Sequence, residues 1–141
     1  MLHFEFSPEL CRHISEAADK ARKESGVDIS LAIADRSGYL RYFIRFGDAI
    51  IPSIEISHNK AYTAAVLGQS TRDFGKIAQP DGPAFGINVT HPKLVIFGGG
   101  FPLQIDGEVV GGLGVSGGSV EEDEAVAASA LEAFRQAADR Q

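Results

Sequence analysis

The residues most suited to chemistry in this sequence are a lysine and a threonine three positions apart, Lys60 and Thr63. Residues at this spacing share one face of a helix, so the ammonium and the hydroxyl are neighbours. A lysine beside an apolar face is most often a solvated side chain. It could instead pair with a ligand carboxylate or with the acidic residues Asp123 and Glu124. In a partly dry cleft it could act as an acid or base, so Lys60 is the candidate catalytic residue.

Arg72 and a run of three glycines at residues 98–100 could complete a site for an anion. The Arg72 guanidinium could hold a carboxylate through two hydrogen bonds, although an ordinary surface arginine fits the sequence equally well. Backbone amides of adjacent glycines are unhindered donors to anionic oxygen. We therefore expect a concave pocket between the helix of Lys60 and the turn at residues 98–102. The expected ligand-binding residues are Lys60, Thr63, Arg72, Gly98, Gly99, Gly100, Pro102, Asp123 and Glu124.

The expected pocket leads to a prediction about the contribution of Lys60 to ligand binding. A charge-assisted hydrogen bond contributes about 1.5–3 kcal/mol, so Lys60→Ala should weaken binding of an anionic ligand at least about tenfold. If Lys60 serves binding alone, we expect the stability of the fold to change little.

Residues 112–117 match the G-x-G-x-x-G fingerprint of dinucleotide-binding proteins. Nucleotide binding is disfavoured because the four carboxylates at residues 121–124 would repel a pyrophosphate at the start of the next helix. The second strand and acidic residue that such a fold needs are also missing before Gln141. Glycines inside a strand more often mark the close approach of a helix, a neighbouring subunit or a flat ligand.

Charge and composition exclude several kinds of partner. The chain has 141 residues, a formal net charge of −6 and an isoelectric point near 5.1, which argue against nucleic acid and anionic membranes. Cys11 is the only cysteine, so no internal disulfide forms. No apolar run approaches a membrane span and no signal sequence is evident, so we expect one cytoplasmic domain over residues 1–141. No metal site is expected, because metal-ligand spacing is absent among His3, His13, His58 and His91.

Hydrophobic periodicity and turn residues predict nine elements. They are helices at 8–25, 54–67, 72–78 and from 119 onward, and strands at 27–33, 39–46, 93–97, 101–105 and 108–115, with a loop over 79–92. Two tight turns join consecutive strands as hairpins, so the sheet should be mainly antiparallel. The fold class is therefore α+β, with helices packed on the sheet.

Four segments resemble the GlcG/HbpS family, which includes the C-terminal domain of PduO. They are HNKAYTAA (58–65), STRDFG (70–75), FGGGFPLQIDGEVVGGLGVSGG (97–118) and EEDEAVA (121–127), and the resemblance spans residues 27–134. It implies a profilin-like fold with a five-stranded antiparallel sheet. It also implies a homo-oligomer, because members of the family assemble.

The same resemblance implies a small-ligand-binding function, with haem or a related tetrapyrrole as the ligand. Haem would be held non-covalently, since the sequence lacks a Cys-x-x-Cys-His attachment motif. His13 and His58 are the candidate axial ligands. Lys60 could then pair with a haem propionate. The alternative is an enzyme of small-molecule catabolism, such as an isomerase, tautomerase or lyase, that acts on a carboxylate-bearing substrate.

Overall fold

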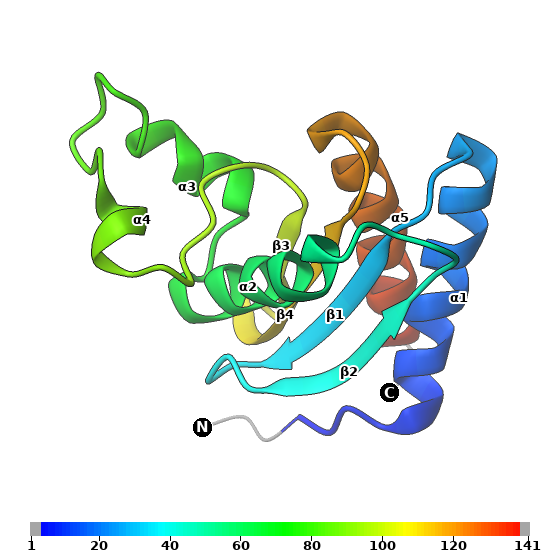
Figure 1. The fold of residues 1–141 in the computed structure, drawn as a ribbon. Helices are drawn as coiled ribbons and strands as arrows, with labels where there is room; N and C mark the ends of the chain where they lie inside the picture. Colours follow the sequence, from blue (N-terminus) through cyan, green and yellow to red (C-terminus); the bar gives the residue numbers. More distant parts are fainter. Residues whose placement is uncertain (1–3, 139–141) are drawn as a thin grey trace.

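A computed structural model describes residues 4–138, which form a four-stranded sheet with helices on both faces (Figure 1). The elements in chain order are α1 (Pro8–Ser25), β1 (Ser30–Asp35), β2 (Leu40–Arg45), α2 (Pro52–Leu67), α3 (Thr71–Ile77), α4 (Ile87–Thr90), β3 (Gly100–Ile105), β4 (Glu108–Ser116) and α5 (Val120–Ala138). Within these residues no helix is long and apolar enough to cross a membrane.

The two helices at the ends of the chain begin at the predicted capping residues. Ser7 accepts a hydrogen bond from the Leu10 N–H at 3.1 Å and so caps α1. At α5, Ser119 and Glu122 exchange two hydrogen bonds of 3.1 and 2.9 Å, the reciprocal pattern of a capping box. This cap fixes the first turn of α5, which carries Asp123.

The sheet has the strand order β2-β1-β4-β3, and each neighbouring pair is antiparallel. α1 and α5 cover one face and α2 covers the other (Figure 1). Successive side chains of β1 point to opposite faces of the sheet, and both faces are buried. Leu31 and Ile33 pack into the main core with α1 and α5, whereas Ala32 and Ala34 pack against Ala61 of α2. Small side chains on the α2 face let this helix lie close to the sheet.

The α+β class and the antiparallel sheet are confirmed, but the sheet has four strands and not five. Residues 93–97, which were predicted as a strand, form no strand ladder in the described structure. The Val95 N–H instead donates to the Thr63 hydroxyl of α2 at 3.0 Å, and this hydroxyl lies 3.0 Å from the Lys93 carbonyl oxygen. Because a helix side chain bonds these backbone groups, the segment packs as an irregular stretch on α2. The profilin-like assignment stays a prediction.

The glycines of β4 serve the close approach of α2. A Cβ atom at Gly112 would collide with the Ala61 carbonyl oxygen, and one at Gly114 would lie 2.6 Å from the Ala61 nitrogen. Contact within the chain therefore explains these glycines without a neighbouring subunit. A ligand lying flat on this strand is ruled out, because α2 covers it.

Candidate functional site

The Lys60 side chain is fully buried where α2, β4 and α5 meet. Its Nζ donates hydrogen bonds to the Val115 carbonyl oxygen at 2.8 Å and to Asp123 Oδ2 at 3.1 Å. Val115 lies near the end of β4, and Asp123 lies in the first turn of α5. The ammonium therefore joins three elements, and the predicted contact between Lys60 and Asp123 is confirmed.

Asp123 is almost as deeply enclosed as its partner, with 3% of the residue exposed. Its second oxygen, Oδ1, accepts a hydrogen bond from the Gly118 N–H at 2.8 Å. Each charge of the pair thus has one charged partner and one backbone partner. Such additional hydrogen bonds are what a buried ion pair needs to offset the loss of water.

Burial shifts the pKa values of both groups toward their neutral forms. It lowers the pKa of Lys60, and the attraction of Asp123 and Glu124 opposes this shift. Burial also raises the pKa of Asp123, against the attraction of Lys60 and the hydrogen bond from Gly118. Burial thus opposes the charged form of each group, and the attraction between the two charges favours it.

Two glycines separate this pair from the protein surface. A Cβ atom at Gly99, whose φ is 122°, would lie 2.6 Å from Lys60 Nζ. A Cβ atom at Gly98 would lie 2.7 Å from Glu124 Oε2. Only a backbone without side chains fits between the lysine and the Glu124 carboxylate. The third glycine of the run, Gly100, donates its N–H to the Thr71 hydroxyl at 3.0 Å, so this amide already has a partner within the chain.

Arg72 and Glu124 lie together at a surface hollow beside these glycines. Arg72 Nη1 is 4.0 Å from Glu124 Oε2, and the Arg72 side chain is 68% exposed. The hollow measures about 510 Å³, and we call it the α3–α5 hollow; it is lined by Arg72, Val120, Glu121, Glu124, Ala125 and Ala128. Glu124 Oε1 is buried and has no hydrogen-bond partner among the described residues.

The predicted residues thus gather around Lys60, but they do not form one open pocket. Thr63 holds residues 93–95 through its hydroxyl, and Pro102 lies in β3 opposite Gly112. Lys60 and Asp123 are enclosed, whereas Arg72 reaches solvent. Full enclosure contradicts the idea of a solvated Lys60. If Lys60 served binding alone, its removal was expected to change stability little; the buried ion pair favours the opposite prediction, since Asp123 would lose its buried partner.

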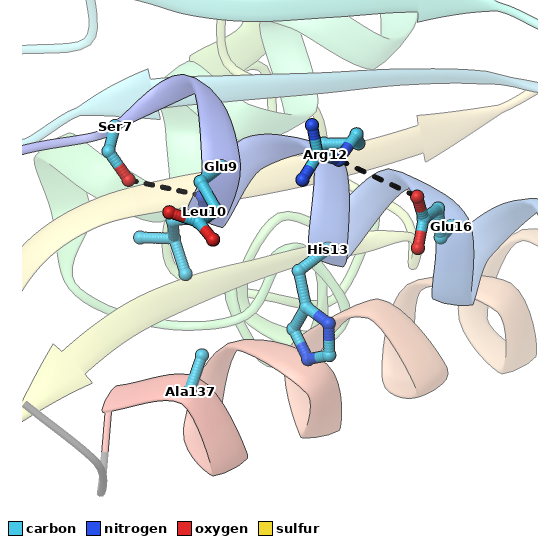
Figure 2. Close-up of a pocket in the computed structure, with 7 residues that line it drawn as sticks. All are labelled: Ser7, Glu9, Leu10, Arg12, His13, Glu16 and Ala137. Atoms are coloured by element: carbon cyan, nitrogen blue, oxygen red, sulfur yellow. Dashed lines mark hydrogen bonds and ion pairs between the residues drawn. The ribbon is translucent and has the colours of Figure 1, made fainter.

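The two candidate axial histidines lie in different surroundings. His13 is exposed on α1, and Figure 2 shows its ring projecting toward α5. It lines a hollow of about 540 Å³, the α1–α5 hollow, together with Ser7, Glu9, Leu10, Arg12, Glu16 and Ala137. His58 is half-buried on α2, and its Nε2 is enclosed and has no partner in the described structure. His91 contacts the Tyr62 hydroxyl at 3.1 Å, and His3 lies outside the described residues.

We predict that Asp123→Asn destabilises the protein more at about pH 4 than at about pH 7. Because the pKa of Asp123 is raised in the folded state, the folded protein binds this proton more readily than the unfolded chain. Acidification therefore stabilises the wild type through Asp123. The variant lacks this gain in stability. Its buried Lys60 must also be protonated with no Asp123 carboxylate beside it. Urea unfolding at the two pH values measures the difference.

Asp73→Asn is a control whose destabilisation should change with pH in the opposite direction. Asp73 is exposed, and its hydrogen bond with Lys76 holds the pKa of this carboxyl below its usual value. The wild type therefore loses this stabilisation as the pH falls, so the effect of Asp73→Asn should shrink under acid. An Asp123→Asn effect that is equal at both pH values would contradict the assigned shift.

Comparison with known proteins places the chain in a family. A model of the family described as haem degrading protein HbpS-like matches residues 6–132. The chain therefore belongs to the HbpS-like family, as its sequence segments predict.

Three relatives show how far the similarity extends. GlcG of Escherichia coli strain K12 is 32% identical over 110 residues, which cover 78% of this chain and 80% of GlcG. PduOC, solved as a complex with heme, is 33% identical with a TM-score of 0.88, and the match covers 92% of this chain and 95% of PduOC. A double mutant of HbpS from Streptomyces reticuli is 25% identical with a TM-score of 0.84, and the match covers 94% and 88% of the two chains.

Proposed function

We propose that the protein binds haem non-covalently in the α1–α5 hollow, with His13 as an axial ligand. The similarity to PduOC, which was solved with heme, supports haem as the ligand. The observation that carries the site is the exposed imidazole of His13 on the wall of a hollow of about 540 Å³. Bound haem would supply an iron centre for redox or gas-binding chemistry.

Three kinds of side chain in the α1–α5 hollow suit the binding of haem. His13 offers a ring nitrogen to the iron, Leu10 and Ala137 offer apolar contact to the macrocycle, and Arg12 offers a cation to a propionate. Arg12 lies 3.7 Å from Glu16, and both side chains are mostly exposed, so this ion pair is weak and easily exchanged for a propionate.

The other candidate positions fit less well. His58 Nε2 is enclosed, so iron could reach it only after the surrounding side chains move. The ammonium of Lys60 is buried and already bonded within the chain, to Val115 and Asp123. We therefore assign haem to the α1–α5 hollow, and a direct contact between Lys60 and a propionate is not part of the proposal.

His13→Ala should abolish the shifted Soret band that the wild type develops when haem is added. The reason is that the macrocycle loses its iron ligand and keeps only surface contacts. Absorbance titration measures this, with His91→Ala as the control histidine, because His91 lies outside the hollow and pairs with Tyr62. A wild type without a Soret shift would refute haem binding, and an unchanged His13→Ala titration would refute the site.

We also propose that the protein is a homo-oligomer. Several large apolar side chains are exposed on the single chain, which is typical of a surface that another copy covers. They include Ile50, Ile51, Phe85 and Val89, each more than half exposed. Light scattering should give a mass of at least two copies of the 15.0 kDa chain, and a mass of one copy would refute the oligomer.

A further inference from the structure

The amine of Lys60 differs from every other lysine amine in the chain. Its side chain has no exposed surface, whereas the remaining lysines are all exposed: Lys20, Lys23, Lys76 and Lys93. An ammonium has three hydrogens to donate. Two of them are donated to the Val115 carbonyl oxygen and to Asp123, so the third has no acceptor among the described residues.

Asp123 Oδ2 lies 3.1 Å from Lys60 Nζ, within the distance for direct proton transfer. Burial disfavours the ammonium and the Asp123 carboxylate alike, which favours the uncharged amine beside an uncharged carboxylic acid. An uncharged amine is a nucleophile toward carbonyl carbon, and desolvation is a known way to activate a lysine for this chemistry. The neighbouring carboxyl group is placed to move protons during such a reaction.

The backbone of Gly98 and Gly99 lies between this amine and Glu124, a residue that lines the α3–α5 hollow. The preceding residue, Phe97, is outside the lining of the hollow, but its ring centroid lies 5.2 Å from Lys60 Nζ and the residue is 44% exposed. Movement of this exposed ring would therefore uncover the amine beside the hollow. Arg72 at the edge of the hollow offers a partner for a carboxylate.

We propose that Lys60 is a carbonyl-reactive amine that forms an imine with a small oxo acid entering from the α3–α5 hollow. Arg72 would bind the carboxylate, and Phe97 would move aside to admit the carbonyl group. This site is independent of haem binding, because α1 with His13 and α2 with Lys60 lie on opposite faces of the sheet (Figure 1).

The reaction balances without an oxidant or reductant. The lone pair of the Lys60 nitrogen forms a bond to the carbonyl carbon, and Asp123 carries a proton from this nitrogen to the carbonyl oxygen. The nitrogen lone pair then forms the second carbon–nitrogen bond as the carbon–oxygen bond of the carbinolamine breaks. Asp123 protonates the departing hydroxyl and takes back the last proton on the nitrogen. The products are an imine and water.

Reductive trapping with pyruvate and cyanoborohydride at about pH 6.5 tests the proposal, because an ordinary lysine amine is almost fully protonated there. Peptide mapping by mass spectrometry reads each lysine separately. Because the pKa of Lys60 is lowered by burial, we expect Lys60 to be labelled faster than any exposed lysine. Label confined to the exposed lysines would overturn the proposal.

Variants separate reactivity from access. Lys60→Arg keeps a cation beside Asp123 and should retain the far-ultraviolet circular dichroism of the wild type while losing the label at this position.

Phe97→Ala should accelerate labelling of Lys60. Tyr39→Ala, which removes another exposed aromatic ring outside the lining of the hollow, is the matched control and should leave the rate unchanged. A Phe97→Ala rate equal to the wild-type rate would refute entry past Phe97. A normal Soret titration in the same samples would show that only this site has failed.

Discussion

Lys60→Ala should lower the free energy of unfolding by about 3–5 kcal/mol, because it leaves Asp123 buried without its charged partner. Asp123 would keep only the Gly118 N–H, and the Val115 carbonyl would lose its donor. The variant would also leave a cavity between α2, β4 and α5. Urea unfolding followed by circular dichroism measures the change.

Lys76→Ala is the matched control for this experiment. Lys76 lies 3.1 Å from Asp73, the same distance as in the buried pair, but both side chains are more than half exposed. An exposed ion pair contributes about 0–1 kcal/mol, so the control should change the free energy of unfolding by no more than this. A Lys60→Ala protein as stable as this control would show that water reaches Asp123 in the folded state.

A double variant tests whether the cost comes from the unpaired charge. Lys60→Met with Asp123→Asn removes both charges and keeps an amide oxygen that can accept from the Gly118 N–H. Its destabilisation should be smaller than the sum of the two single effects by at least about 1 kcal/mol. Strict additivity would show that the two side chains do not interact.

Gly112→Leu should destabilise the fold by about 3 kcal/mol or more, because a side chain at this position collides with the backbone of α2. A Cβ atom there meets the Ala61 carbonyl oxygen, and helix backbone cannot yield as a flexible side chain would. For a chain of this length the expected fall in Tm is roughly 6–12 °C. Differential scanning calorimetry measures it directly.

Glu108→Leu places the same side chain at an exposed position of the same strand and should change Tm by little. If Gly112→Leu matched this control, α2 could not lie as close to β4 as described. The pair of variants therefore tests the helix–strand contact that holds Lys60 in place.

The elements that depend on local signals could be predicted from the sequence. Ser7 and the residues at 119 and 122 cap their helices as expected, because capping uses atoms a few positions apart. The pairing of Lys60 with Asp123 could also be predicted, because the two residues carry opposite charges and lie in two segments, 58–65 and 121–127, that resemble the same family. Its complete enclosure could not, because it depends on how closely α2 approaches β4.

The incorrectly predicted strand at residues 93–97 shows where local signals fail. Its apolar run is typical of a strand, and two of its residues, Leu94 and Val95, are indeed buried. What the sequence does not reveal is that Thr63, about thirty positions earlier, bonds the backbone of this segment. A tertiary contact has replaced the strand ladder.

The α1–α5 hollow was not predicted, although His13 was a candidate ligand. Its walls come from the start of α1 and the end of α5, which are at opposite ends of the sequence (Figure 2). The position of His13 beside the apolar stripe of the first predicted helix, which includes Leu10 and Ile14, was the available signal. It did not indicate the space beside this histidine.

A crystal structure of the protein grown with haem would show where haem binds. We expect haem in the α1–α5 hollow, with iron bonded to a ring nitrogen of His13 and a propionate near Arg12. Haem bound at His58, in the α3–α5 hollow or at any site that leaves His13 without iron would contradict it.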